Sequence, residues 1–183
     1  DKMKYITLLR NVNISGKNKI SMKELKQELE NISYQNVTTY RNSGNIIFNC
    51  NNKNKDVITK DIHQILKNKF NLENEIVVIT KEELEDILTN SPNWWGREDK
   101  TIYDNIIFII PPAKYNELYN NIGAPNEKLE KIQEYKDTIF WSYILKEYRK
   151  TNWWSKTAQK NVSNLITIRT ANTIKKILEI ANN

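Results

Sequence analysis

The sequence is poor in the residues that most catalytic and metal sites use. One cysteine, Cys50, and one histidine, His63, occur in 183 residues. A single cysteine excludes an internal disulfide, and one histidine without a cysteine pair does not fit the usual zinc sites. The four glycines stand far apart, at 16, 44, 96 and 123, so there is no glycine-rich phosphate loop. We therefore expect no metal and no cofactor.

Long apolar runs are also missing. No stretch approaches the roughly 20 apolar residues that a bilayer-spanning helix needs. The first residues lead directly into a strand-like segment and not into a signal peptide. Hydrophobic residues make up 39% and charged residues 27%, which is typical of a globular protein. These features predict a cytoplasmic protein without membrane contact, and they leave the oligomeric state open.

The formal charge of +6 admits two interpretations. A basic protein can bind nucleic acid or another polyanion. A lysine-rich surface can also be a plain solvated surface, the product of AT-rich coding, and we favour this interpretation. Only five of the 28 basic residues are arginines, and AT-rich coding works against them: Arg10, Arg41, Arg97, Arg149 and Arg169.

In the first 80 residues, short apolar segments alternate with amphipathic ones. Residues 4–10, 36–40, 45–50 and 75–79 are β-prone, and two segments, 22–31 and about 58–66, have helical spacing of apolar residues. Ser21 and Glu24 form the capping-box pattern ahead of the first helix. The order β-α-β-β-α-β is that of the ferredoxin-like unit, with both helices on one face of an antiparallel sheet.

Residues 81–183 repeat this order loosely. Their patterns predict strands at 105–110, 130–135 and 138–145 and helices at 81–89, 112–121, 153–160 and 170–181. The segment 165–168 is apolar, and no element is assigned to it. Pro112 fits the first position of its helix. We expect an α+β protein with two lobes: a ferredoxin-like lobe over 1–80, and a second α+β lobe over 81–183, interpreted as ferredoxin-like with C-terminal helices.

Polar and cationic residues gather at three places where strands or helices begin or end. The loop after the first strand carries Arg10, Asn13, Lys17 and Lys19 ahead of a helix N-terminus, a combination that suits an oxyanion such as phosphate. The alternative is a plain Asn- and Lys-rich loop. The hairpin turn carries Arg41, Ser43 and Asn45, which are also ordinary turn residues.

The third place lies before the last helix. Thr170 is a good N-cap, but capping does not explain Arg169, and an arginine beside a positive helix end favours an anionic partner. The predicted ligand-binding set is therefore Arg10, Asn13, Lys17, Lys19, Arg41, Ser43, Asn45, Arg169 and Asn172.

Aromatic and basic residues also alternate between 141 and 160. Such a segment can stack bases and bind phosphates. Packing of Trp141 and Tyr143 in the core is the alternative that we favour. In the first lobe, only Tyr5 and Phe48 are available for a stacking platform on the sheet.

Three segments resemble a bacterial family of uncharacterised proteins, domain-of-unknown-function family 1697. They are 8–25, with its Leu-Leu-Arg opening and Met-x-x-Leu helix; 39–45, Thr-Tyr-x-x-Ser-Gly-Asn; and 169–173. Asn11 and Ser15 stand where the family pattern has glycines, and Thr170-Ala171 replaces Asn-Trp. The resemblance implies a two-lobed α+β fold with a ferredoxin-like first part, and it implies no established activity.

Three functions follow as hypotheses. The first is binding of an anionic, phosphate-bearing small molecule or nucleotide through the predicted set. The second is binding of single-stranded nucleic acid on a sheet face. The third is an enzyme acting on a phosphorylated substrate, for which the sequence offers no recognisable catalytic residues.

Overall fold

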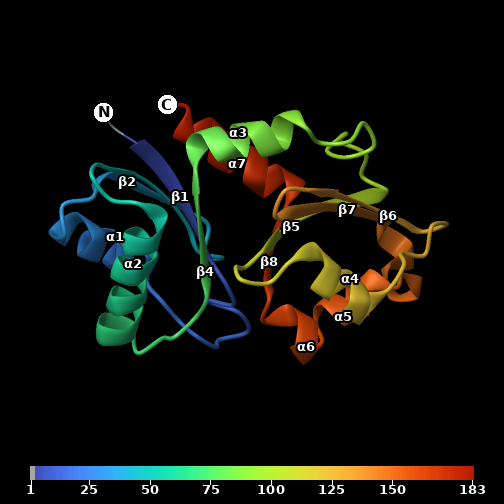
Figure 1. Ribbon diagram of the computed structural model, residues 1–183, viewed down its shortest axis with the longest axis horizontal. Helices are drawn as coiled ribbons and strands as arrows, with labels where there is room; N and C mark the ends of the chain where they lie inside the picture. Colours follow the sequence, from blue (N-terminus) through green and yellow to red (C-terminus); the bar gives the residue numbers. More distant parts are fainter. Residues whose placement is uncertain (1–2) are drawn as a thin grey trace. The chain divides into compact units, whose positions relative to one another are not determined.

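The computed structural model describes residues 3–183, which form two compact units. The first unit contains the residues up to Glu85 together with Ile177–Asn183, and the second contains Asp86–Lys176. Each unit is built on its own four-stranded antiparallel sheet (Figure 1). The predicted α+β class with two lobes is confirmed.

The first unit has the ferredoxin-like order that the sequence predicts. Its elements are β1 (Met3–Leu9), α1 (Met22–Asn31), β2 (Gln35–Tyr40), β3 (Asn45–Cys50), α2 (Lys55–Phe70) and β4 (Ile76–Thr80). The strands lie in the order β2-β3-β1-β4, and every neighbouring pair is antiparallel. Both helices cover one face of this sheet and close a core between helices and strands (Figure 1).

Local capping sets the ends of these helices. The Ser21 hydroxyl accepts a hydrogen bond from the amide of Glu24 at 3.2 Å, and Asn54 caps α2 in the same way through Val57, at 2.9 Å. Asn71 ends α2 in the left-handed conformation, with φ 54°. The predicted start of α1 is therefore confirmed by its cap.

The second unit repeats the same topology. Its elements are β5 (Ile102–Ile109), α4 (Tyr115–Ile122), β6 (Glu130–Tyr135), β7 (Thr138–Ile144), the 3-10 helix η1 (Leu145–Lys150), α5 (Trp153–Thr157), α6 (Lys160–Ser163) and β8 (Ile166–Thr170). The strand order β6-β7-β5-β8 corresponds to that of the first sheet. Helices α3 (Lys81–Thr89) and α7 (Ala171–Ala181) complete the chain.

The core of the second unit lies between its sheet and the helices α4, α5 and α6. Trp153 is fully buried, and its indole N–H donates to the carbonyl of Gly123 at 3.1 Å. Trp141 and Tyr143 pack in the same cluster. The interpretation of these two aromatic residues as core residues is confirmed.

Two predicted helices of the second unit were wrong in their bounds, and one unassigned segment is a strand. Pro112 does not begin a helix: Pro111 and Pro112 form a turn with a cis peptide bond, Lys114 is extended, and α4 starts at Tyr115. The helix expected over 153–160 is divided into α5 and α6, because Gln159 takes an extended conformation. The apolar piece at 165–168 belongs to β8, which pairs with β5. None of the helices within residues 3–183 has the length and apolarity needed to cross a membrane.

Candidate functional site

The loop after β1 is a compact, hydrogen-bonded turn. The amide of Lys17 donates to the carbonyl of Ile14 at 2.8 Å, and the amide of Asn13 donates to the carbonyl of Asn18 at 3.1 Å. Ser15 and Gly16 lie at the tip with φ of 49° and 76°. The turn displays its lysine side chains to solvent, because Lys17 and Lys19 are both exposed.

Asn13 ties this loop to the β2–β3 turn. Its amide nitrogen Nδ2 donates to the carbonyls of Ile20, at 3.1 Å, and Asn42, at 2.8 Å, and its Oδ1 accepts from the Ile20 amide at 2.9 Å. The structure therefore brings two of the three predicted segments together within the first unit. Asn13 acts there as a brace, since both polar atoms of its side chain are used in the loop.

The β2–β3 turn is shaped by Gly44 and Asn45. The Gly44 carbonyl accepts from the Leu9 amide at 2.8 Å, so the turn lies directly on the end of β1. The buried Asn45 donates through Nδ2 to the carbonyl of Tyr40 at 2.8 Å and to the Ser43 hydroxyl at 3.0 Å. For Ser43 and Asn45, these contacts support the plainer interpretation as turn residues.

A hollow of about 490 Å³ opens where the loop and the turn meet at the N-terminus of α1. Eight residues line it: Asn13, Gly16, Lys19, Ile20, Ser21, Glu24, Asn42 and Phe70. Arg41, next to Asn42, is exposed and places its guanidinium 5.3 Å from the ring centre of Tyr40. Arg10 differs from these cations, because its Nη1 lies 3.3 Å from a carboxylate oxygen of Glu75.

Arg169 and Asn172 belong to the second unit. Arg169 lies in β8 opposite Ile106 of β5 and is only 6% exposed. Its Nη1 donates to the Thr167 hydroxyl at 2.8 Å and to the carbonyl of Ile168 at 3.0 Å. Burial lowers the pKa of this guanidinium to about 10, so it stays charged at neutral pH.

Asn172 lies in the first turn of α7 and lines a hollow of about 530 Å³ in the second unit. Thr170 caps this helix, because its hydroxyl accepts from the Thr173 amide at 3.3 Å. The capping role that the sequence predicts for Thr170 is confirmed. The same hollow is also lined by Gly96 and Lys100, from the loop before β5, and by Asp104 of β5.

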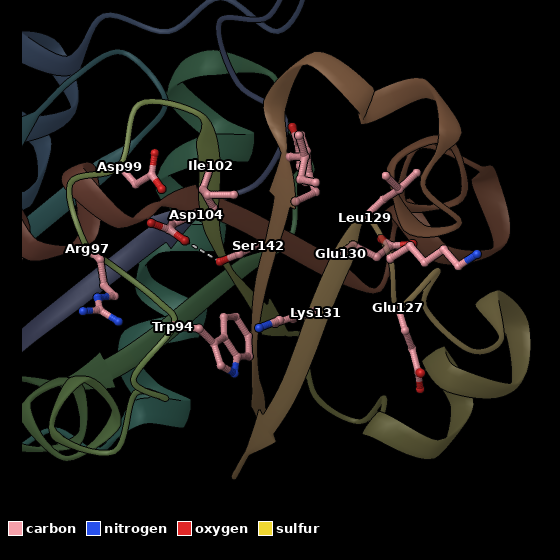
Figure 2. A pocket seen from close by; sticks show the side chains of 13 residues that line it. Trp94, Arg97, Asp99, Ile102, Asp104, Glu127, Leu129, Glu130, Lys131 and Ser142 are labelled. Carbon is pink, nitrogen blue, oxygen red and sulfur yellow. Dashed lines mark hydrogen bonds between the residues drawn. The ribbon is translucent and has the colours of Figure 1, made fainter.

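A further hollow of about 510 Å³ lies in the second unit and was not predicted from the sequence. Trp94 and Arg97 come from the loop before β5, and Asp104, Lys131 and Ser142 come from three neighbouring strands (Figure 2). Ser142 interrupts the apolar and aromatic run that follows Thr138 in β7, and this irregularity is the signal in the sequence that could have indicated the hollow.

A family described as "Protein of unknown function (DUF1697)" has a model that matches residues 3–140. The chain belongs to this family. A solved structure titled as that of the conserved bacterial protein SP0830 from Streptococcus pneumoniae is 27% identical to the chain, with a TM-score of 0.87. The match covers 99% of both chains. No curated protein matches the sequence.

The departures of this DUF1697 protein from the family pattern have a backbone explanation in the first loop. Asn11 and Ser15, which replace glycines, have φ of 58° and 49°. This is the left-handed region that glycine favours and that asparagine tolerates. In the C-terminal motif, Ala171 stands where the pattern has tryptophan, and it lines the hollow at the start of α7.

Most of the aromatic residues considered for nucleic-acid stacking in this DUF1697 protein are buried, and Trp154, at 41% exposed, is the exception. Phe48 stacks on Tyr34 at 4.8 Å and on Tyr5 at 6.1 Å between ring centres, all within the core under α1 and α2. Trp141 and Trp153 lie in the core of the second unit. These rings therefore offer no exposed stacking platform.

The single thiol of the DUF1697 protein is a core residue. Cys50 is 6% exposed, and burial raises the pKa of its thiol. Within residues 3–183, no three His, Cys, Asp or Glu residues are arranged to hold a metal ion.

Proposed function

We propose that this DUF1697 protein binds a small phosphate-bearing anion at a basic loop cluster, defined as Lys17, Lys19 and Arg41. The observation that carries the proposal is the hydrogen bond from Asn13 to the carbonyl of Asn42, at 2.8 Å. It joins two segments that are far apart in the sequence around one hollow. Lys19 lines this hollow, and Lys17 and Arg41 directly follow or precede residues that line it.

The charges of the cluster support an anionic ligand. Across residues 3–183, neither lysine nor the Arg41 guanidinium makes an ion pair with a carboxylate. Glu24 is the one carboxylate among the residues that line the hollow. Within the lining, Lys19 and Glu24 balance each other, and the positive excess comes from Lys17 and Arg41, which are adjacent in sequence to lining residues. Such an excess attracts an anion.

The backbone supports the same ligand class. Five residues of the loop have positive φ: Asn11, Asn13, Ser15, Gly16 and Asn18. Turns with positive φ can present backbone N–H groups to an anion. The amides of Asn13 and Lys17 are already used within this loop, so only its other amides are available for a ligand. The first turn of α1 lies at the same hollow, and its dipole is positive at this end.

Titration calorimetry with inorganic phosphate, pyrophosphate, ribose 5-phosphate and a nucleotide tests the proposal. We expect saturable binding that weakens as salt is added, because the lysines are exposed. The double variant Lys17→Gln/Lys19→Gln should bind about tenfold more weakly, which corresponds to about 1.4 kcal/mol.

The matched control is Lys23→Gln/Lys26→Gln, which removes two exposed lysines of α1 and the same total charge. It should bind as tightly as the native protein. An equal loss of affinity in both double variants would mean that only net charge matters, and silence of the native protein across the whole panel would refute the proposal. Binding of oligonucleotides and of none of the small anions would favour the nucleic-acid hypothesis instead.

A further inference from the structure

The second unit carries a row of polar side chains across three strands. Asp104 of β5 lies opposite Ser142 of β7, and Ser142 lies opposite Lys131 of β6. Directly opposite residues of antiparallel strands point to the same face of the sheet. The row therefore places a carboxylate, a hydroxyl and an ammonium side by side, and all three line the hollow of about 510 Å³ (Figure 2).

The centre of the row is buried and hydrogen-bonded. Ser142 is 4% exposed, and its hydroxyl donates to a carboxylate oxygen of Asp104 (Figure 2). Within residues 3–183, this hydroxyl is the sole hydrogen-bond donor to the Asp104 side chain, and the carboxylate makes no ion pair. Asp104 can therefore accept a further hydrogen bond from a ligand in the hollow.

The two ends of the row are complementary charges that are too far apart to pair. Two strand spacings separate Asp104 from Lys131, about 10 Å at the backbone. Neither Lys131 nor Arg97 forms an ion pair in the part of the chain that the structure describes. The hollow consequently offers an acceptor at one end and two cations for an anion, Lys131 at the other end and Arg97 on the loop. Lys128 is a third cation of the lining, and its other carboxylates are Asp99, Glu127 and Glu130.

An indole ring forms a wall of the hollow. Trp94 is half-buried, and Figure 2 shows the Lys131 side chain directed toward its ring. The neighbouring Trp95 anchors this loop, because it is 5% exposed, its indole N–H donates to the carbonyl of Asn105 at 2.7 Å, and its ring packs edge-on against Phe140. An anchored loop holds Trp94 ready to stack with a flat ring.

We infer that this hollow binds a nucleoside monophosphate whose base carries an exocyclic amino group. The base would stack on Trp94, the amino group would donate to Asp104, and the phosphate would pair with Lys131 and Arg97. A carboxylate accepts from an amino group and repels the carbonyl oxygen that other bases carry at the same position. A volume of about 510 Å³ lies within the range of small-molecule sites. This site is separate from the basic loop cluster and does not depend on it.

Calorimetric titration of the full chain with AMP, IMP and adenosine tests the inference, because IMP replaces the amino group with an oxygen and adenosine lacks the phosphate. We expect AMP to bind about tenfold more tightly than either, in line with a hydrogen bond to a charged group. Asp104→Asn should abolish the preference for AMP over IMP. Lys131→Gln should weaken AMP binding about tenfold and leave adenosine binding unchanged.

Two controls separate this site from other causes. Lys136→Gln removes an exposed lysine outside the hollow and should leave the affinity for AMP unchanged. Lys17→Gln/Lys19→Gln should leave the preference for AMP over IMP unchanged, so that the inference is tested independently of the proposed function. Equal binding of AMP and IMP by the native protein, or no binding of AMP at millimolar concentration, would overturn the inference. This comparison needs no variant, so it decides the question even where Asp104→Asn does not fold.

Discussion

Gly44 of the β2–β3 turn packs directly against Leu9 at the end of β1, and its carbonyl accepts a hydrogen bond from the Leu9 amide at 2.8 Å. A Cβ at position 44 would lie 2.7 Å from the Cβ of Leu9 and 2.9 Å from Cγ2 of Val12, and the φ of Gly44 is +89°. Contacts at these distances are closer than real Cβ atoms approach other heavy atoms. The β2–β3 turn therefore rests on the loop of the basic loop cluster at a position where only glycine fits.

Gly44→Ala should destabilise the protein by about 3 kcal/mol, because the new methyl group meets the buried Leu9 and the left-handed backbone disfavours a side chain. Urea unfolding measures the loss. Gly16→Ala is the matched control: its φ is +76°, but the nearest atom to the added Cβ is Cε of Lys19 at 3.9 Å. It should cost about 1 kcal/mol from the backbone alone. Equal costs for the two variants would show that the close contact at Gly44 is unimportant.

Thr7→Val should stabilise the protein by about 1 kcal/mol. The Thr7 side chain is fully buried in β1, and among residues 3–183 its hydroxyl has no hydrogen-bond partner. An unsatisfied buried hydroxyl is costly, and valine has nearly the same shape without the polar atom. Thermal and urea unfolding of the variant measure the change. Its comparison is Thr59→Val in α2, which removes a hydroxyl that donates to the carbonyl of Lys55 at 2.7 Å and should not stabilise. A destabilised Thr7→Val protein would contradict this expectation.

Glu130→Gln should destabilise the second unit by about 3 kcal/mol. The Glu130 carboxylate is 2% exposed and accepts four N–H groups. They are the amides of Asn126, Asn152 and Trp153 and the indole of Trp141, at 2.9, 2.5, 3.3 and 3.1 Å. A glutamine presents an NH₂ group where one oxygen accepted, so donors would face donors.

The loss in Glu130→Gln is measured by urea unfolding followed through tryptophan fluorescence. Glu127→Gln is the matched control, since this exposed carboxylate has no hydrogen bond within the described residues, and it should change stability by less than about 0.5 kcal/mol. If both variants unfold at the same urea concentration as the native protein, the four contacts do not stabilise the fold.

Glu83 should give the first unit a pH-dependent contribution to stability. Burial acts to raise the pKa of Glu83, but the hydrogen bonds from Lys55 and from the amide and hydroxyl of Thr80 outweigh it, so the pKa lies below the ordinary value of 4.5. Because the pKa is lowered in the folded state, the stabilisation is present above about pH 4.5 and is lost as the pH falls below it.

The measurement is the difference in unfolding free energy between the native protein and Glu83→Gln at pH 7 and at pH 3. The native protein should be the more stable at pH 7, and the difference should shrink at pH 3. Glu82→Gln, an exposed neighbour in the first turn of the same helix, should show no such dependence. A difference that grows on acidification would have the wrong sign.

Features with local causes could be predicted from the sequence. The helix predicted over 81–89 begins at Lys81 as predicted, and Thr80 and Glu83 form a reciprocal capping box at its start, with both hydrogen bonds at 3.0 Å. The strand and helix periods of the first unit are similarly local, since each depends on neighbours a few residues away. This is why the ferredoxin-like order could be predicted.

Arg169 shows where local reasoning failed. Arg169 does stand just ahead of a helix, since α7 begins at Ala171, but the sequence did not predict that it is also a buried residue of β8, opposite Ile106 of β5. A five-residue strand with a charge in it has no distinctive pattern by itself. Pairing with a strand about 60 residues earlier decides its conformation, and that information is not local.

The amino-acid sequence by itself determined the elements of the first sheet, the residues of the β2–β3 turn and the positions where cations follow strands, because propensity, capping and periodicity act over a few residues. The tertiary structure alone decided which of these residues meet. Asn13 reaches Asn42, and Asp104, Ser142 and Lys131 form a row, only once strand order and register are set. Register follows from packing of the whole sheet face, since a shift by one residue would turn every side chain to the other side.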